Sequence, residues 1–226
     1  MRQKVIFEDL GLINYKKAWN IQEDRLNSII ERKNNNLPVY HHLYFCEHPH
    51  VYTLGKSGQK NNLLANPDLL KKINAEFYEI NRGGDITYHG PGQIVGYPIF
   101  DLEGLKIQVK KYIFMLEEAV INCLKLYNIE GDRMDGATGV WIDKEIPGKA
   151  RKICAIGVRA SRFVTMHGFA LNFSTDLSYF KYINPCGYID KGVTSVEKEL
   201  GRGVDITRFK EHLLEQVLNI FLLELE

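Results

Sequence analysis

The stretch NRGGDITYHGPGQ, residues 81–93, places four glycines and a proline within thirteen positions. Gly83-Gly84 forms one bend, and Gly90-Pro91-Gly92 forms a second bend that cannot continue a strand. The residues between the bends, DITYH, are interpreted as a strand edge that presents side chains toward a pocket. Because glycine lacks a Cβ atom and accepts positive φ, such bends let a ligand lie against bare main chain. A glycine-rich hairpin with purely structural turns is the other interpretation, since the spacing matches neither GxGxxG nor GxxxxGK[ST].

Outward from this stretch, apolar periodicity predicts helices interspersed among short strands. Helical spacing predicts three longer helices, at 14–33, 107–126 and from about residue 207. Runs rich in β-branched and aromatic residues between proline and glycine breaks predict strands. The predicted strands are 5–11, 39–48, 51–55, 76–80, 93–102, 139–142, 152–160 and 163–174, with shorter helices at 66–74 and 194–201. This mixture predicts an α/β or α+β fold around a mixed sheet.

The length of 226 residues suits one large domain with a sizeable core. No linker or repeat divides the chain, so we expect residues 1–226 to form a single domain on which the helix from about 207 packs. A separate small lobe from about residue 205 is the alternative, although no linker marks it.

The charges are almost balanced, with 29 Lys+Arg against 28 Asp+Glu and a formal charge of +1. Such a balance supplies no global field for nucleic acid or anionic lipid, so we expect neither as a partner. The first residues, MRQKVIFEDLG, become polar too early for a signal peptide, and no apolar run reaches the roughly 18 residues of a membrane span. We therefore expect a cytoplasmic protein.

Cys186, in INPCGY (183–188), is the candidate nucleophile among the four cysteines. It lies between a proline and a glycine in a segment without strand or helix period, whereas Cys46, Cys123 and Cys154 lie in apolar runs typical of core thiols. No CxxC pair is present, which argues against a zinc ribbon or a disulfide framework. An incidental loop thiol is the alternative interpretation of Cys186.

A nucleophilic thiol needs activation, because free cysteine with a pKa of about 8.5 is only slightly ionised at neutral pH. Lys152 opens a strand in phase with Cys154 and Ile156, and a lysine on an apolar strand face must snorkel, pair or be functional. His89 adjoins the glycine bends and is the better histidine candidate for a pocket. His167 is interpreted as a core histidine.

The segment HHLYFCEHPH (41–50) contains four histidines, a cysteine and a glutamate within ten residues. Adjacent His41 and His42 point to opposite faces of a strand and cannot easily share one ion. The segment also lacks the helical spacing of HExxH. We therefore expect no metal site.

Four segments together resemble the lipoyl(octanoyl) transferases. They are RGGDITYHGPGQIVGYPIFDL (82–102), RKICAIGVR (151–159), VTMHGFALN (164–172) and INPCGYIDKGVTSVEKELG (183–201), in the family's order. The resemblance implies the fold shared by biotin and lipoate protein ligases, a mixed sheet flanked by helices. It implies an octanoyltransferase that moves octanoate, or a lipoyl group, from acyl carrier protein to a lysine of a lipoyl domain, the first step of lipoate biosynthesis.

The resemblance also implies the site residues. Cys186 stands at the position of the acyl-accepting nucleophile, and Lys152 stands at the lysine that lowers the thiol pKa. The residues at the positions that line the acyl site are Arg82, Gly83, Gly84, Asp85, Ile86, Thr87, Tyr88, His89, Ala155, Ile156, Gly157, Gly168, Phe169 and Ala170. Phe169 and Ile156 vary the family's apolar pattern conservatively.

The implied partners are octanoyl acyl carrier protein, the lipoyl domains of 2-oxoacid dehydrogenase E2 subunits and the glycine cleavage H protein. No cofactor is expected, because exchange of one thioester for another needs no ATP. Acyl carrier protein is acidic, and a local patch of Lys149, Arg151, Arg159 and Arg162 is expected to steer its docking. Three alternatives stay open: an ATP-dependent lipoate or octanoate ligase, a hydrolase that pairs Cys186 with His89 or His167, and a binding module with an inert thiol.

Overall fold

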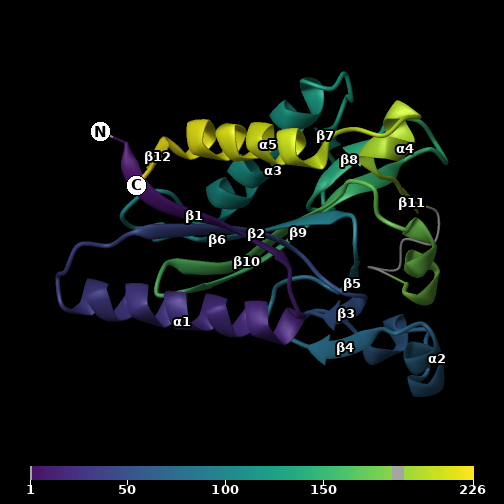
Figure 1. Ribbon diagram of the computed structural model, residues 1–226, viewed down its shortest axis with the longest axis horizontal. Coiled ribbons are helices and arrows are strands. Elements are labelled where there is room, and N and C mark those ends of the chain that lie inside the picture. The colour runs from purple at the N-terminus through teal and green to yellow at the C-terminus, as the bar shows by residue number, and fades with distance from the viewer. Residues whose placement is uncertain (1, 185–190) are drawn as a thin grey trace.

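The computed structural model describes residues 2–184 and 191–226 and has a large mixed sheet, a small sheet and five α-helices in those ranges (Figure 1). The helices are α1 (Tyr15–Asn34), α2 (Pro67–Lys72), α3 (Val109–Lys125), α4 (Val196–Leu200) and α5 (Ile206–Phe221), with 3₁₀ turns η1 (Lys60–Asn62) and η2 (Leu177–Tyr182). The strands are β1 (Gln3–Leu12), β2 (His41–Glu47), β3 (Val51–Leu54), β4 (Glu76–Glu79), β5 (Ile86–His89), β6 (Gln93–Ile99), β7 (Asp132–Arg133), β8 (Val140–Ile142), β9 (Arg151–Ser161), β10 (Val164–Asn172), β11 (Gly192–Val193) and β12 (Leu223–Leu225).

The large sheet has the strand order β12-β1-β2-β6-β10-β9-β8-β7, with β11 paired to β9 outside this order. β1 is parallel to both β2 and β12, and β11 is parallel to β9. The strands from β2 through β6, β10, β9 and β8 to β7 are antiparallel in succession. The expected mixed sheet is therefore confirmed.

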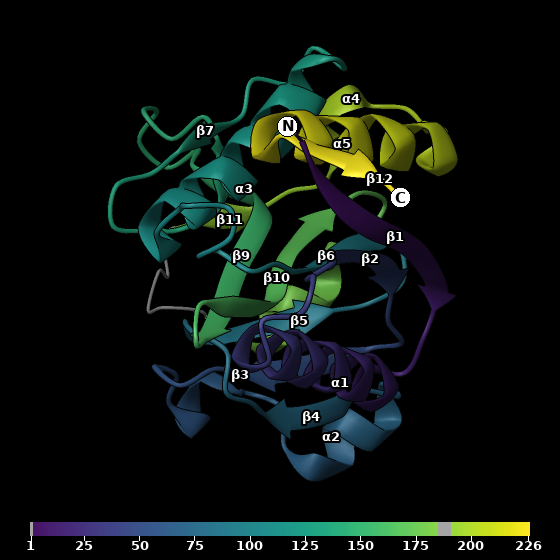
Figure 2. The same ribbon diagram turned by 90° about the vertical axis from the view of Figure 1, so that its left-hand side faces the viewer.

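Helices cover both faces of this sheet, as Figure 2 shows edge on. Alternation along β2 divides its side chains, with Leu43 and Phe45 packed toward α3 and α5 and with Tyr44 and Cys46 packed toward α1. The core on the α3 and α5 side includes Phe209 at the start of α5. The terminal helix thus completes the main core.

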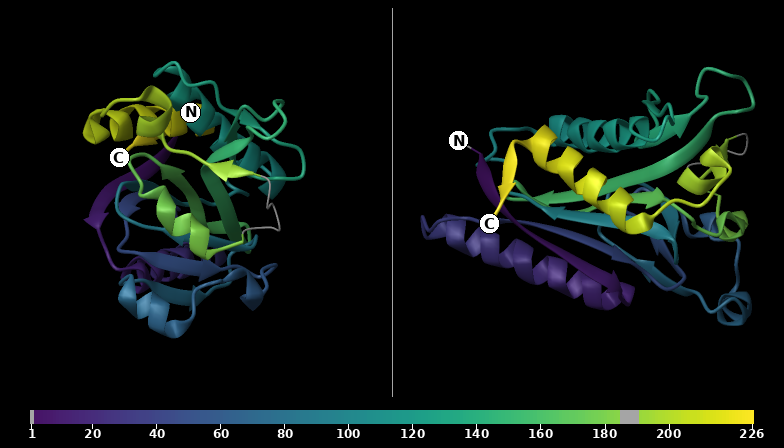
Figure 3. Two further views of the ribbon diagram at one scale, coloured as in Figure 1. Left: turned by 90° about the vertical axis from the view of Figure 1, so that its right-hand side faces the viewer. Right: turned by 45° about the horizontal axis from the view of Figure 1, so that its top comes forward.

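The small sheet, in the order β4-β3-β5, lies beyond one end of α1 and has α2 beside it (Figure 3). β3 is parallel to β4 and antiparallel to β5. Tyr52 and Tyr88 fill its own core together with Phe180 of η2. This sheet and the large sheet enclose the space in which the predicted site residues meet.

Sequence periodicity predicted the longer elements correctly, and two features differ from expectation. The strands at 51–54, 76–79 and 86–89 pair with one another in a separate sheet. The terminal helix ends at Phe221 because Leu222 has a left-handed conformation (φ 53°), and the chain continues as β12 beside β1. In the described residues, no helix is long and apolar enough to cross a lipid bilayer.

Candidate active site

Two connected cavities lie between the large sheet, the small sheet and the first turn of α1. The space that a water-sized molecule can occupy is about 30 Å³ in the inner cavity and about 250 Å³ in the outer cavity. Arg82, Thr87, Ala155 and Ile156 line both, so they mark the passage between the two. The inner cavity is also lined by Tyr15, His89, Val95, Tyr97, Gly157, His167, Gly168, Phe169 and Ala170. The outer cavity is also lined by Gly84, Asp85, Ile86, Gly136, Ala137, Thr138, Trp141, Lys152, Phe180, Lys191, Gly192 and Val193.

The three stretches that the sequence indicated meet at these cavities, apart from Gly83 and Tyr88. The ring of Tyr88 points to the small core, where its hydroxyl and His50 Nδ1 are 2.8 Å apart and its ring stacks on Tyr179. The main-chain N–H of Gly83 donates to the carbonyl of Val158 at 3.0 Å. The N–H of Gly83 is therefore used within the fold.

The glycines at 83–84 have a packing role that the sequence did not reveal. A Cβ atom on Gly157 of β9 would lie 2.8 Å from the carbonyl oxygen of Gly83, and one on Gly55 would lie 2.3 Å from that of Gly84. Gly84 also has φ +88°, which side chains rarely allow. The close approach of this bend therefore requires glycine at 55 and 157, whereas the positive φ favours glycine at 84.

Arg82 holds this bend in place. Its Nη1 donates to the carbonyl of Gly83 and its Nη2 to that of Asp85, both at 2.7 Å. Asp85 in turn accepts from the main-chain N–H of Ile86 at 2.6 Å and from Asn62 Nδ2 at 2.7 Å. The guanidinium and the carboxylate thus fix the main chain that separates the two cavities.

Lys152 reaches the outer cavity because β9 contains an irregularity. Val140 of β8 pairs with Cys154, but the next residue, Trp141, pairs with Lys152, so β9 has one extra residue, Ile153. Ile153 and Cys154 are both fully buried in the large core. The expectation that Lys152 lies in phase with Cys154 is therefore wrong.

The ammonium of Lys152 contacts the loop before β8. Its Nζ donates to the carbonyl of Thr138 at 3.0 Å and lies 4.6 Å from the centre of the Trp141 ring. Both partners line the outer cavity. The lysine is thus held against a polar and an aromatic wall of that cavity.

Cys186, the expected nucleophile, lies outside the described residues. The described residues on both sides of the segment that contains it are held in place, and those after it line the outer cavity. Before that segment, Asn184 donates its main-chain N–H to the carbonyl of Asn62 at 2.8 Å. After it, Lys191 lines the cavity and Val193 pairs with Lys152.

The other three cysteines are buried in the cores, as expected. Burial raises the pKa of Cys123 to about 12 and raises the pKa values of Cys46 and Cys154 well above the ordinary range of a thiol. These three thiols are therefore not ionised at neutral pH.

The four histidines of 41–50 diverge to separate partners. His41 Nε2 lies 2.8 Å from Gln3, His42 Nδ1 lies 3.3 Å from the Tyr44 hydroxyl, and His48 Nε2 lies 2.7 Å from the Tyr97 hydroxyl. His50 stacks on Tyr179. In the described ranges, no three His, Cys, Asp or Glu side chains converge as metal ligands.

His89 and His167 both line the inner cavity. They lie far apart in the sequence, so no spacing pattern indicates that they share a cavity. Burial lowers the pKa of each to about 3, so both imidazoles are neutral at pH 7. The interpretation of His167 as a purely core residue is incomplete, because it is buried and yet lines the cavity.

Several lining residues were missed by sequence reasoning. Tyr15 was interpreted as part of the apolar face of the first helix, and Tyr97 and Trp141 as ordinary strand residues. Their aromatic character fits a core equally well, so no sequence signal marked them.

The expected basic patch is also wrong as one surface, because Lys149 precedes β9 and Arg162 follows it, and eleven strand residues span roughly 35 Å.

Comparisons with known proteins agree with this architecture. Residues 14–218 match the family model of the lipoyl protein ligase A/B catalytic domain. A protein from Cytophaga hutchinsonii named octanoyltransferase is 53% identical over 99% of this chain and 95% of its own length. One of the same name from Parabacteroides distasonis is 54% identical over 95% of this chain and 97% of its own length.

Solved structures of low identity share the fold. A bipartite lipoate protein ligase from Thermoplasma acidophilum, described with its E2 lipoyl domain, has a TM-score of 0.72 at 14% identity, covering 100% of this chain and 86% of that chain. A biotin protein ligase from Aquifex aeolicus in complex with biotin and ATP has a TM-score of 0.54 at 10% identity, covering 96% and 70%. The expected biotin and lipoate protein ligase fold is confirmed.

The chain therefore belongs to the lipoyl protein ligase A/B catalytic domain family. Within that family, its relatives at about half identity over nearly the full length are octanoyltransferases. The resemblance inferred from the motifs is thereby confirmed, and so is the expectation of an acyltransferase that transfers octanoyl groups.

Proposed function

We propose that this octanoyltransferase takes the octanoyl group from acyl carrier protein onto Cys186 and passes it to a lysine of a lipoyl domain, as one catalytic domain spanning 1–226. The observation that carries the proposal is the location of Lys152. Lys152 lines the outer cavity, and so do Lys191 and Gly192, the first described residues after the segment that contains Cys186.

In the first step, the Cys186 thiolate attacks the carbonyl carbon of the octanoyl thioester. A cation near a thiol favours the ionised form, so Lys152 would lower the thiol pKa. The new carbon–sulfur bond forms as the bond to the carrier's thiol breaks, and that thiolate leaves and takes up a proton. One thioester replaces another, so the step is nearly isoenergetic and consumes no ATP.

In the second step, the neutral amine of the target lysine attacks the acyl-cysteine. The carbon–nitrogen bond forms, the carbon–sulfur bond to Cys186 breaks, and the nitrogen loses a proton. Lys152 is the proposed acceptor of that proton, because it becomes a neutral amine when it gives its own proton to the carrier's leaving thiolate in the first step. Formation of an amide from a thioester makes the transfer downhill.

The shape of the site supports an acyl substrate. The inner cavity leads away from Lys152 through the passage at Arg82 and Ile156, and the apolar groups Val95, Phe169 and Ala170 line it. We propose that the acyl tail occupies this inner cavity while its carbonyl stays in the outer one. Lipoyl domains of E2 subunits and the H protein are the proposed acceptors, which accords with the lipoyl domain described for the Thermoplasma neighbour.

The ligase and hydrolase alternatives rank behind this proposal. The relatives at half identity are octanoyltransferases, whereas an adenylating ligase of this fold is represented by neighbours of 14% identity or less. A Cys–His hydrolase would use His89 or His167, but both imidazoles lie in the inner cavity, and Lys191 and Gly192, which follow the cysteine segment, lie at the outer one.

One experiment tests the proposal directly. The protein is mixed with octanoyl acyl carrier protein without ATP, and its mass and its peptides are measured before and after addition of an unmodified lipoyl domain. An octanoyl adduct on Cys186 that disappears as the lipoyl domain gains the same mass is expected. Full turnover with Cys186 never modified, or turnover by a Cys186→Ser variant at the normal rate, would refute the route.

A further inference from the structure

His167 has a main-chain conformation that is unusual for the middle of a strand. Its φ is +59°, in the left-handed region, although it lies inside β10. Strand alternation sends Met166 to the core beside α1 and Phe169 to the core beside α3 and α5. His167 lies against α1, because its main-chain N–H donates to Gln22 Oε1 of that helix at 2.8 Å and its ring lies 6.5 Å from the ring of Trp19. A bulky residue held in this conformation stores strain that the surrounding structure must support.

This conformation brings a buried hydrogen-bond acceptor to the inner cavity. The Nε2 of His167 lies 3.0 Å from Asn81 Oδ1 and donates to it, so Nδ1 of the neutral ring has a lone pair. Across the described residues, Nδ1 has no hydrogen-bond partner, although the side chain is only 1% exposed. An unpartnered polar atom in such a place is costly unless a ligand or water satisfies it.

A second acceptor comes from His89, and a chain of amides fixes its tautomer. Asn172 Nδ2 donates to the carbonyl of Thr194 at 3.0 Å, which leaves Asn172 Oδ1 to accept from Gln93 Nε2 at 2.9 Å. Gln93 Oε1 must then accept from His89 Nδ1, at 2.8 Å. Because Nδ1 holds the proton of the neutral ring, His89 Nε2 has a lone pair at the inner cavity.

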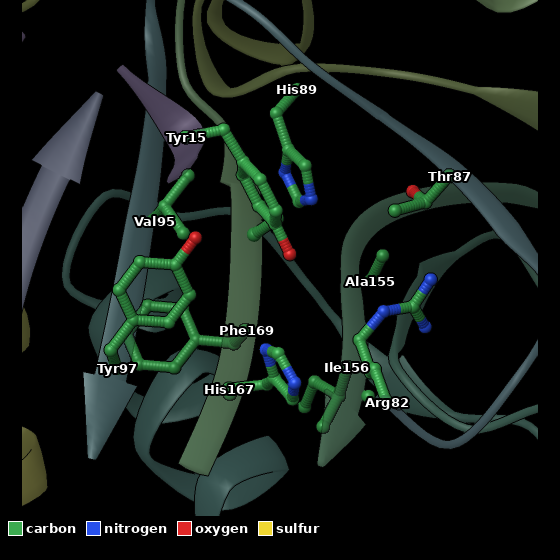
Figure 4. Close-up of a pocket in the computed structure, with 13 residues that line it drawn as sticks. Tyr15, Arg82, Thr87, His89, Val95, Tyr97, Ala155, Ile156, His167 and Phe169 are labelled. Carbon is green, nitrogen blue, oxygen red and sulfur yellow. The ribbon is translucent and has the colours of Figure 1, made fainter. Parts of the chain in front are cut away.

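The two imidazoles face the inner cavity from opposite sides, and Val95, Phe169 and Ala170 are among its apolar lining residues (Figure 4). Figure 4 shows the side chains of Tyr15, His89 and His167 converging from different sides on the same space. Tyr15 and Tyr97 are also almost inaccessible to solvent. The way in from Lys152 leads through the passage at Ala155 and Ile156.

We propose that the inner cavity ends in a polar subsite, in which His167 Nδ1 and His89 Nε2 accept hydrogen bonds from a donor at the far end of the acyl group. The inference rests on the proposed entry of the acyl tail into this cavity. A chain that stops short of the imidazoles leaves space for water to satisfy them. A longer alkyl chain covers the lone pairs with methylene groups, whereas a chain of the same length that ends in a hydroxyl satisfies them. Chain-length selection thus acts through hydrogen bonding as well as through cavity length.

The test compares two acyl donors that have the same number of non-hydrogen atoms. Nonanoyl and 8-hydroxyoctanoyl acyl carrier protein differ only in a terminal methyl or hydroxyl group. The wild-type enzyme is expected to use the hydroxylated donor at least as well as nonanoyl, judged by kcat/KM. In His167→Phe, kcat/KM for 8-hydroxyoctanoyl divided by kcat/KM for nonanoyl is expected to fall roughly tenfold. The reason is that a site that hydrogen-bonds a hydroxyl discriminates strongly in its favour. Phenylalanine suits this left-handed position, since Phe163 of the same chain has φ +63°.

His89→Phe is the second variant and carries the test if His167→Phe does not fold. Phenylalanine at position 89 retains a ring beside Tyr15, on which His89 now stacks. Met166→Leu is the matched control, because Met166 is the buried neighbour of His167 and lines neither cavity. A wild-type preference for nonanoyl, or an equal ratio in all four proteins, would overturn the inference. Octanoyl transfer through Cys186 is measured in parallel, so failure of the proposed route is recognised separately.

Discussion

The carboxylate of Glu117 on α3 accepts a hydrogen bond from the main-chain N–H of Gly139, with Oε1 and N 2.9 Å apart. The other oxygen of the same carboxylate receives Arg133 Nε at 3.1 Å. The residue before Gly139 is Thr138, whose carbonyl accepts the ammonium of Lys152. A buried carboxylate in the large core thereby holds the loop against which the proposed catalytic lysine lies.

Glu117→Ala is therefore expected to destabilise the fold and to disturb Lys152. It leaves the Gly139 N–H without its acceptor and Arg133 without one of its two carboxylates, which together cost about 2–4 kcal/mol of unfolding free energy. Urea unfolding measures that loss. The control is Glu118→Ala, which removes the more exposed partner of Arg133 and is expected to cost less than about 1 kcal/mol. Equal losses in the two variants would contradict the role given to Glu117.

Lys152→Met is expected to move the alkylation of Cys186 to higher pH. Removal of a nearby cation disfavours the thiolate, so the pKa of Cys186 rises, and the rate of reaction with iodoacetamide at neutral pH falls about tenfold for each unit of the rise. The pH profile is read by mass spectrometry of the Cys186 peptide. Lys191→Met, which removes another cation of the outer cavity, is the control and is expected to shift the profile less. An unchanged pH profile in Lys152→Met would show that Lys152 does not lower the pKa of Cys186.

Sequence periodicity could predict the elements but not the local irregularities that build the site. The composition of β2 predicts a strand. In the structure Leu43 and Phe45 enter one core, and the alternating Tyr44 and Cys46 enter the other. The extra residue at Ile153 interrupts the same alternation in β9 and sends Lys152 to the outer cavity. No spacing rule indicates it, because a bulge is set by how β9 pairs with β8 and not by the composition of β9.

The same limit applies to the cavity walls. The glycines of 81–93 pointed to the right place, but their crowding by Gly157 and Gly55 depends on three segments meeting in space. The left-handed conformation of His167 is likewise supported by Gln22 of α1, which is 145 positions away in the chain. Motif resemblance located the site where periodicity could not, since it reports which residues act together.

Stability is expected to fall steeply as the pH falls from about 6.5 toward 4. Burial lowers the pKa of His48 to about 4 and those of His89 and His167 to about 3, against about 6.5 in the unfolded chain. In that window the unfolded state binds more protons than the folded state, so unfolding becomes more favourable as pH decreases. Each histidine contributes up to about 1.4 kcal/mol per pH unit. Urea unfolding at about pH 7 and about pH 5 measures the slope, and an equal stability at both would contradict buried neutral imidazoles.

Docking of the acidic acyl carrier protein is expected to depend on the basic residues at one end of β9 only. Lys149 is exposed beside the hollow lined by Ala150 and Lys191, close to the outer cavity, whereas Arg162 follows the opposite end of the strand. Lys149→Glu is therefore expected to slow association severalfold at low ionic strength and much less at high salt, because rim charges act on the association rate and are screened. Arg162→Glu makes the same charge change and is the control. Stopped-flow binding of octanoyl acyl carrier protein distinguishes them, and equal effects of the two substitutions would mean that the carrier responds to net charge and not to the surface beside the cavity.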